Sequence, residues 1–122
     1  FAYLHDGLKD LEGFQLMEKY PESEPAWFGF LLTVKDGAHF TRNELVKHLE
    51  SNRIQTRNLF AGNLLKHPCF ETLAEGKDYR IAGELRNTDK IMNDSFWIGV
   101  FPGMNKAKLD YMIEVIRRFL KT

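Results

Sequence analysis

The sequence predicts an α+β fold, an α/β sandwich in which a small sheet carries helices on one face. Two almost uninterrupted apolar segments, 26–34 and 96–101, are typical of strands, and each is followed by a segment with helical periodicity. With 122 residues, 43% of them hydrophobic and 28% charged, the chain has the size and composition of one globular domain. These patterns do not determine the order of the strands.

The N-terminal segment has helical spacing, with apolar residues at Phe1, Leu4, Leu8 and Leu11. Gly13 is placed to end this helix in the left-handed conformation, and residues 14–17 are expected to form a short strand. A helix that starts at the first residue without a capping side chain is typical of a chain cut at a domain junction. We therefore expect residues 1–122 to be one domain of a longer polypeptide.

The middle of the chain predicts a strand, a helix and a second strand. Segment 26–34 (AWFGFLLTV) is rich in aromatic and branched residues, which indicates a strand covered on both faces. Thr41 and Glu44 have the spacing of a helix capping box, and the helix is expected to run to about Ser51. The weak alternation of residues 53–59 predicts a more exposed strand.

Residues 60–87 keep no periodicity and are interrupted by glycine and proline, which predicts a long irregular connection of the kind that often carries function. Thr88 is expected to cap a short helix before the strand at 96–101. Asn105 is expected to open a C-terminal helix with one apolar stripe. The stripe consists of Leu109, Met112, Ile113, Ile116 and Leu120.

The charge balance argues against nucleic-acid and membrane partners. Seventeen Lys and Arg residues balance seventeen Asp and Glu residues. No apolar run approaches the roughly 20 residues that span a bilayer. The aromatic residues of the strand segments are therefore expected to pack in the core rather than stack on bases. They are Trp27, Phe28, Phe30, Phe96 and Trp97.

Histidine and cysteine form no recognisable metal-binding pattern. The four histidines have unrelated spacings, so no metal site is expected. Cys69 is expected to be a buried structural thiol, and a single cysteine suits a reducing cytoplasm. Phosphate-binding loops and nucleophile elbows are missing from the sequence, so a self-contained nucleotide enzyme is not supported.

Arg57 is the most suggestive polar residue. It stands at the end of a predicted strand and precedes Phe60-Ala61-Gly62-Asn63 and His67-Pro68. A guanidinium beside glycine-permitted backbone and an amide is suited to an anionic or hydroxyl-rich ligand, whereas the equally weighted alternative is a surface salt bridge. A second polar cluster is expected to be a solvated loop. It consists of Glu84, Arg86, Asn87 and Asp89.

Three long blocks of sequence resemble one known family. PAWFGFLLTV, RNELVKHLESNRIQTRNLFAGNLLKHPCF and GELRNTDKIMNDSFWIGVFPGM are similar, in this order, to the C-terminal region of the DegT/DnrJ/EryC1/StrS family of sugar-modifying enzymes. Within that family they most resemble the CDP-4-dehydro-6-deoxyglucose 3-dehydratase group. The resemblance covers nearly the whole chain.

The resemblance implies the small C-terminal domain of a pyridoxal-phosphate-dependent transferase of the aspartate aminotransferase fold type I, with a small, mostly antiparallel sheet. The full-length enzyme would use pyridoxal or pyridoxamine 5′-phosphate (PLP or PMP). The cofactor ligands, the catalytic base and any iron–sulfur cysteines would lie upstream. Residues 1–122 alone are then expected to bind no cofactor or metal and to be inactive. A cytoplasmic homodimer and an iron–sulfur reductase partner are also implied.

The implied activity is removal of the C3 hydroxyl from CDP-4-dehydro-6-deoxyglucose, a nucleotide-linked 4-keto-6-deoxyhexose, for dideoxysugar and lipopolysaccharide O-antigen synthesis. By this resemblance the substrate-binding residues are Arg57, Phe60, Asn63 and His67, and none of the catalytic residues lies in this chain. Leu64-Leu65 replaces the L-H step of aminotransferase relatives, which favours dehydration over transamination. A nucleotide-sugar aminotransferase and a stand-alone α+β binding module are the alternatives.

Overall fold

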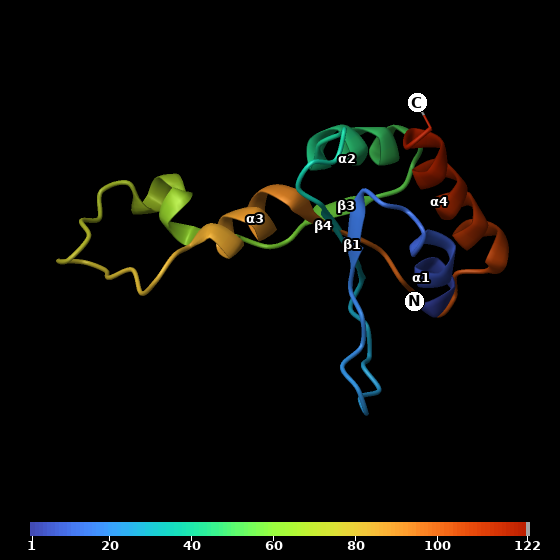
Figure 1. The fold of residues 1–122 in the computed structure, drawn as a ribbon, viewed down its shortest axis with the longest axis horizontal. Helices are drawn as coiled ribbons and strands as arrows, with labels where there is room; N and C mark the ends of the chain where they lie inside the picture. The colour runs from blue at the N-terminus through green and yellow to red at the C-terminus, as the bar shows by residue number, and fades with distance from the viewer. Residues whose placement is uncertain (122) are drawn as a thin grey trace.

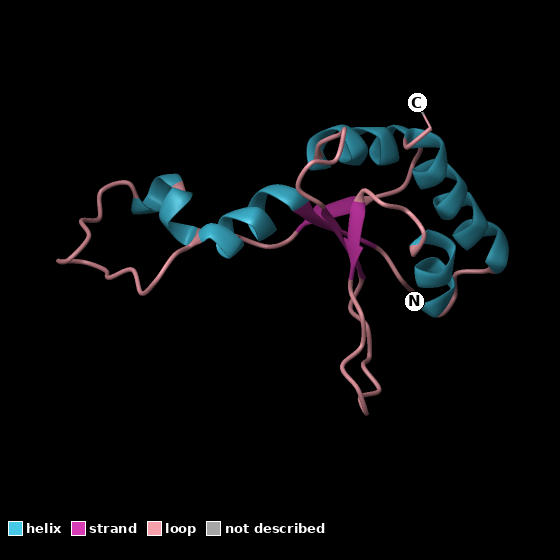
Figure 2. Cartoon of the chain, viewed as in Figure 1, coloured by secondary structure: helices cyan, strands magenta, loops and turns pink. Residues whose placement is uncertain are grey.

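The computed structural model describes residues 1–121 and contains one antiparallel four-stranded sheet with the order β1-β2-β4-β3. The strands are β1 (Phe14–Leu16), β2 (Phe30–Val34), β3 (Thr56–Asn58) and β4 (Ser95–Ile98). The helices are α1 (Ala2–Leu8), α2 (Arg42–Ser51), α3 (Arg86–Asp94) and α4 (Lys106–Phe119), with the short 3₁₀ turns η1 (Leu64–Lys66) and η2 (Pro68–Phe70). Helices α1, α2 and α4 form a layer against the sheet (Figure 1, Figure 2), which confirms the predicted α+β sandwich.

The face of the sheet that meets α1, α2 and α4, here called the inner face, carries the hydrophobic core. The register pairs Phe30 with Ile98 and Leu32 with Phe96, and each of these side chains is at most 1% exposed. They join buried residues from all three helices, namely Leu4, Leu8, Leu45, Leu49, Met112, Val115 and Ile116. Burial of this apolar surface is the main stabilising contribution to the fold.

Strand β2 is shorter than segment 26–34 predicted, and only one of its faces is buried. Alternate residues from Phe30 to Val34 are buried, and the two between them are half-buried. The expectation of cover on both faces was wrong, because the three helices pack on the inner face alone. Residues 26–29 lie outside the sheet, since pairing with β4 begins where Phe30 meets Ile98.

The predicted helix starts at Thr41 and Asn105 are confirmed. The Glu44 amide donates to the Thr41 hydroxyl over 3.2 Å, and the Thr41 amide donates to the Glu44 carboxylate over 2.7 Å, which completes a capping box on α2. The Asn105 side chain accepts the Lys108 amide over 3.0 Å and caps α4. These local contacts fix where α2 and α4 begin.

Two other helix boundaries differ from the predictions. Helix α1 ends at Leu8, and Gly13 is not in the left-handed conformation. Gly13 instead provides space, because a Cβ atom there would lie 2.6 Å from the Phe40 ring. Helix α3 begins at Arg86, so Thr88 lies inside its first turn and is not its cap.

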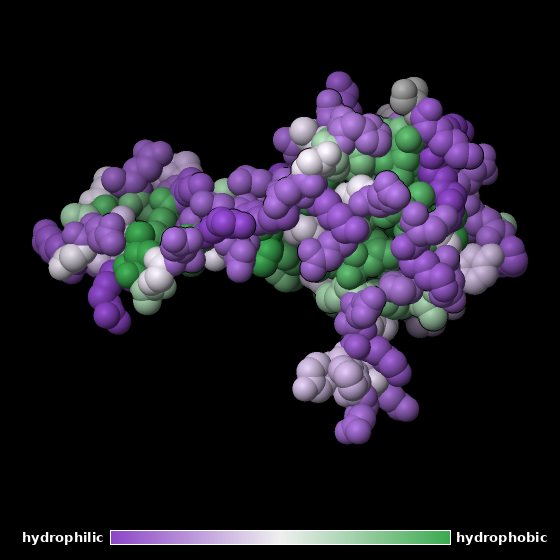
Figure 3. Space-filling model, viewed as in Figure 1, coloured by the Kyte–Doolittle hydropathy of each residue, from purple (hydrophilic) through white to green (hydrophobic). Residues whose placement is uncertain are grey.

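Two stretches of chain project from the sheet (Figure 1). The short arm, residues 17–29, joins β1 to β2, and the long arm, residues 61–85, joins β3 to α3. The long arm contains only η1, η2 and one isolated bridge between Glu75 and Tyr79, which confirms the predicted irregular connection. Hydrophobic atoms are visible on its surface in Figure 3. Cys69 is exposed here, so the prediction of a buried thiol was wrong, because no other layer covers this arm.

Candidate functional site

The opposite face of the sheet, here called the outer face, is left uncovered by α1, α2 and α4. Side chains alternate along a strand, so the outer face carries the residues that lie between the core positions. The register places Leu31 and Arg57 on either side of Trp97. The other outer-face positions of the sheet are Gln15, Thr33 and Ser95. The outer face therefore has a polar part near β1 and α3 and an aromatic part near β3.

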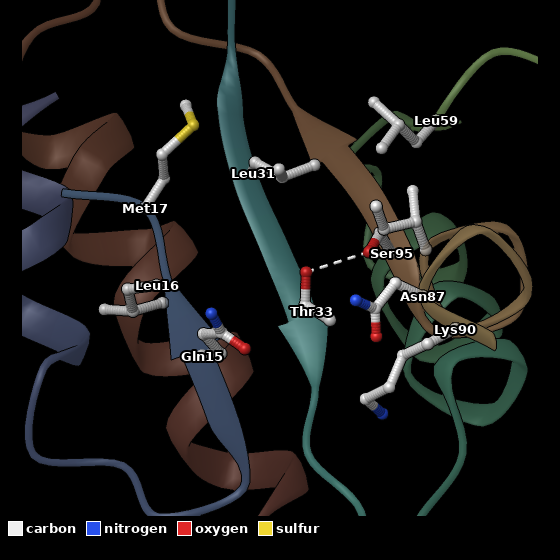
Figure 4. Close-up of a pocket in the computed structure, with 10 residues that line it drawn as sticks. Gln15, Leu16, Met17, Leu31, Thr33, Leu59, Asn87, Lys90 and Ser95 are labelled. Atoms are coloured by element: carbon white, nitrogen blue, oxygen red, sulfur yellow. Dashed lines mark hydrogen bonds between the residues drawn. The ribbon is translucent and has the colours of Figure 1, made fainter. Parts of the chain in front are cut away.

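An open cavity of about 450 Å³ lies over the polar part (Figure 4). Its lining comes from the sheet and from α3. Thr33 and Ser95 share a hydrogen bond of 2.8 Å between β2 and β4. The amides of Gln15 and Asn87 lie on either side of Thr33 in Figure 4. Hydroxyl and amide groups of this kind can bind the hydroxyls of a sugar.

Lys90 lines this cavity, but its ammonium group is used for structure. Its Nζ atom donates to the Val34 carbonyl over 2.9 Å, to Asp36 over 2.7 Å and to Asp94 over 2.9 Å. The hydrogen bonds to Asp36 and Asp94 raise the pKa of Lys90 above its usual value. Lys90 is therefore a protonated link that fastens α3 to the end of β2.

An aromatic cluster of Phe28, Phe60 and Trp97 occupies the other part of the outer face. The Phe28 and Trp97 rings meet edge to face at 5.7 Å, and the Phe60 ring lies 6.3 Å from Phe28 and 6.4 Å from Trp97. Phe28 is 77% exposed and Phe60 is 76% exposed. These two residues stand at the bases of the short and long arms. The cluster thus offers flat apolar surface to a molecule outside the sheet.

Arg57 adjoins this cluster, because it pairs with Trp97 across β3 and β4 and so shares its face. The Arg57 side chain is exposed, and its Nη1 atom donates to the Thr56 carbonyl over 2.8 Å. None of the acidic residues in the described chain forms a salt bridge with it. The alternative role expected for Arg57, a surface salt bridge, is therefore not formed within residues 1–121. With its amide in the orientation that satisfies both atoms, the Gln55 oxygen also accepts from Nη2 over 3.0 Å and from Nη1 over 3.2 Å. The Nε donor and one Nη2 donor of the guanidinium are left for a ligand.

Asn63 is only 4% exposed and packs against α3. Its side-chain nitrogen donates to Asp89 over 2.7 Å, and its side-chain oxygen accepts the Leu65 amide over 3.2 Å. The hydrogen bonds from Asn63 and Lys66 lower the pKa of Asp89 below its usual value. Asn63 therefore holds the long arm against α3.

His67 lies at the junction of η1 and η2 and forms a short hydrogen bond through Nε2 with the Ala61 carbonyl. This contact closes the loop between residues 61 and 67. The structure thus places the four expected site residues in two groups. Arg57 and Phe60 lie at the outer face, whereas Asn63 and His67 shape the start of the long arm.

Several residues around the site were assigned other roles from the sequence. Phe28 and Trp97 were expected in the core with Phe30 and Phe96, but only the latter two are fully buried. The alternation within β4 distinguishes Phe96 from Trp97, and this signal was available in the sequence. The second polar cluster was expected to be a solvated loop. Three of its members, Arg86, Asn87 and Asp89, belong to α3.

Among residues 1–121, side chains of His, Cys, Asp and Glu do not gather in any group of three that could hold a metal ion. Within the same residues, all helices are too short or too polar to cross a membrane. The chemistry available at the outer face therefore consists of the Arg57 guanidinium, the aromatic rings, and the hydroxyl and amide groups of the cavity.

Comparison with known proteins finds sugar-modifying enzymes. The chain is 45% identical over 120 residues to the lipopolysaccharide biosynthesis protein RfbH of Salmonella typhimurium, covering 98% of this chain and 26% of RfbH. It is 44% identical over 117 residues to the dTDP-4-dehydro-2,6-dideoxy-D-glucose 3-dehydratase of Saccharopolyspora spinosa, covering 96% of this chain and 24% of that enzyme. The chain thus spans about a quarter of the length of these relatives.

The fold also matches a solved enzyme. GDP-4-keto-6-deoxy-D-mannose-3-dehydratase of E. coli, with bound hydrated PLP, superposes with a TM-score of 0.80 at 25% identity, over 94% of this chain and 28% of that one. The match confirms the expected fold of a PLP-dependent transferase. The sequence profile of the DegT/DnrJ/EryC1/StrS aminotransferase family matches residues 1–117, and the chain belongs to that family.

Proposed function

We propose that residues 1–122 form the small, substrate-side domain of a longer PLP- or PMP-dependent nucleotide-sugar 3-dehydratase. The observation that carries this proposal is the uncovered outer face, where Arg57 lies beside Trp97 of the aromatic cluster, in a chain related to a nucleotide-sugar 3-dehydratase and to RfbH. The substrate class is a nucleotide-linked 4-keto-6-deoxyhexose, CDP-4-dehydro-6-deoxyglucose in the first instance. The product would serve dideoxysugar and lipopolysaccharide O-antigen synthesis.

In this proposal the chain orients the substrate and leaves bond breaking to the rest of the enzyme. The Arg57 guanidinium binds a phosphate or hydroxyl oxygen, because it carries several donors and a fixed positive charge. The Phe60 and Trp97 rings pack against the apolar side of the sugar or base. Such positioning can be important for rate, since a misplacement of about 1 Å can cost about a hundredfold.

We further propose that the outer cavity of this chain does not hold the cofactor. Lys90 is the lysine that lines the outer cavity, and its Nζ atom is occupied by Val34, Asp36 and Asp94. A protonated amine with three hydrogen-bond acceptors is not available to react with an aldehyde. When bound elsewhere in the full enzyme, the cofactor supplies an amine and a conjugated ring that takes up electrons. We therefore assign the cofactor, and all catalytic groups, to the remaining polypeptide.

The full-length enzyme is further proposed to be a cytoplasmic homodimer with an iron–sulfur reductase as a candidate electron donor. These assignments follow from the relationship to the 3-dehydratases. Residues 1–122 alone are proposed to be inactive. Expression of this segment with and without roughly 300 upstream residues, followed by a dehydratase assay, tests that division of roles.

Replacement of Arg57 by alanine in the full-length enzyme tests the proposed substrate contact. We expect kcat/KM to fall by about ten- to a hundredfold, because the charged contact and its orientation are lost. The thermal unfolding midpoint should stay within about 1 °C of the parent, since surface changes seldom alter stability. Arg80→Ala, an exposed arginine on the long arm, is the matched control and should leave the kinetics unchanged. Unaltered kinetics in Arg57→Ala would reject the assignment.

A nucleotide-sugar aminotransferase is the second candidate, because the matching family is described as an aminotransferase family. The two activities are separable by a glutamate-dependent amine-transfer assay on the full-length protein. Formation of an amino sugar would favour the aminotransferase, whereas loss of the C3 hydroxyl would favour the dehydratase. A stand-alone binding module would show neither activity and would have no upstream cofactor domain.

A further inference from the structure

The turn between β3 and the long arm has an unusual backbone conformation. Phe60 has a φ of +43°, and Gly62 has a φ of +65°. The left-handed region is disfavoured for a bulky side chain such as phenylalanine, so surrounding contacts must hold Phe60 there. The Phe60 amide donates to the Asn58 carbonyl over 2.8 Å, which ties the turn to the end of β3.

The other end of this turn is held by α3. The Asn63 side chain donates to Asp89 over 2.7 Å, and the Asn63 backbone amide points to the Met92 sulfur at 3.3 Å. The Lys66 ammonium forms an ion pair of 2.9 Å with the second oxygen of Asp89. Asp89 therefore binds two residues of the long arm at once, and Asn63 is buried by this arrangement.

Gly62 allows the turn to approach α3 closely. A Cβ atom on Gly62 would lie 2.3 Å from Cγ of Met92, so any other residue would push the turn away from the helix. Its positive φ also favours glycine. Close packing and backbone conformation therefore both require glycine at position 62.

Helix α3 is itself fixed to the sheet. Its last residue, Asp94, is followed directly by the first residue of β4, and Lys90 binds the Val34 carbonyl at the end of β2. The turn that carries Phe60 is therefore anchored at β3 on one side and, through α3, at β2 and β4 on the other. Both anchors belong to the same sheet as Arg57 and Trp97.

We propose that Asp89 is a positioning residue for the substrate site, acting through Asn63 to hold Phe60 beside Trp97 and Arg57. Met92 is a second and separate contact of Asn63 on α3. This inference rests on the proposed function. It assigns Asn63 to the support of the site, and it gives a role to Asp89 that the sequence did not suggest. Asp89 does not touch the substrate in this arrangement.

Three substitutions in the full-length enzyme test the inference. Asp89→Ala removes both contacts to the long arm, whereas Asp89→Asn keeps an oxygen that can accept the Asn63 hydrogen bond. Glu84→Ala is the matched control, because Glu84 is an exposed carboxylate just before α3 that makes no hydrogen bond or ion pair with the described residues. Amide hydrogen exchange of residues 59–66 and steady-state kinetics are measured for each variant.

We expect Asp89→Ala to increase exchange of residues 59–66 at least tenfold, with β2 and β4 unchanged, and to lower kcat/KM about tenfold. Asp89→Asn should recover most of both losses, and Glu84→Ala should match the parent. The inference would be overturned if Asp89→Ala matched Glu84→Ala in amide exchange of residues 59–66 or in kcat/KM.

Kinetics of Phe60→Ala and Arg57→Ala show whether a negative result concerns the positioning role of Asp89 or the proposed function itself. When both variants lower kcat/KM but Asp89→Ala does not, the positioning role is wrong and the substrate site stands. When neither variant changes the kinetics, the proposed substrate site is wrong. The positioning role is then overturned with it, whatever the exchange of residues 59–66 shows.

Discussion

The inner and outer faces of this sheet use the same strands for different purposes. The inner residues of β2 and β4 are at most 4% exposed and pack against three helices. Their immediate neighbours Leu31 and Trp97 stay half-buried, and Arg57 is exposed. Packing against the helices explains why the inner face carries large apolar residues. The exposed residues of the outer face, in contrast, contribute little to the stability of residues 1–121.

The exposed aromatic rings make this contrast sharper. Phe28 and Phe60 are more than three-quarters exposed, although large apolar side chains gain stability chiefly by burial. Phe60 also adopts a disfavoured backbone conformation. Strained and exposed residues of this kind cluster at binding sites, where their contacts are made with another molecule. This exposure supports the proposal that the outer face binds another molecule.

The largest expected effect compares neighbouring residues of β4. Phe96→Ala should lower the free energy of unfolding by about 3–5 kcal/mol, because it leaves a cavity among fully buried side chains. Trp97→Ala should cost about 1 kcal/mol, since Trp97 is only half-buried on the uncovered face. Urea unfolding of residues 1–122, followed by circular dichroism, measures both. Equal losses would contradict the distinction between the faces.

A smaller effect concerns two threonines that the sequence assigned the same role. Thr41→Ala should lower the free energy of unfolding by about 1 kcal/mol, because it removes the capping box of α2 and loosens the helix over the inner face. Thr88→Ala should change it by less than about 0.5 kcal/mol, since Thr88 lies inside α3. A larger loss for Thr88→Ala would show that α3 is capped differently from this description.

Features of the fold that depend on nearby residues are predictable from the sequence, and features that depend on distant pairing are not. The Thr41 box lies within one turn and the stripe of α4 within about three turns, so the local pattern was sufficient to find both. The predicted stripe nevertheless left out Val115, which is fully buried. The start of β2 was missed because it depends on where β4 pairs, at Phe30 and Ile98. Apolar residues such as Phe28 look the same before and after that point.

The site was predictable in part for the same reason. Arg57 and Phe60 share one segment, and the structure places both at the outer face. Trp97 reaches Arg57 only through the order of the strands, which the sequence could not supply. Asp89 lies 26 residues from Asn63, so their contact depends on the path of the whole long arm. These contacts between residues far apart in the sequence could not be predicted, although the residue types themselves were visible.

The smallest expected effect is a local response to acid. The hydrogen bonds from Asn63 and Lys66 lower the pKa of Asp89, and the hydrogen bond from Lys90 lowers the pKa of Asp36. A lowered pKa means that each contact is fully present above the usual value of 3.8 and is lost as the pH falls through the lower folded value. Amide exchange of residues 59–66, corrected for intrinsic rates, should therefore be constant above about pH 5 and increase only below about pH 4.

The inner face should keep its protection over the same range, because its core side chains do not titrate. Asp10 binds Arg117, and Asp110 accepts a hydrogen bond from the Tyr3 hydroxyl, so acid also weakens contacts between the α1 region and α4. Those two helices nevertheless retain buried residues such as Leu4 and Ile116, whereas the turn at 59–66 depends on Asp89. Asp89→Asn should make exchange of the turn nearly independent of pH. Loss of protection in β4 at the same pH as in the turn would mean that the two faces do not open separately.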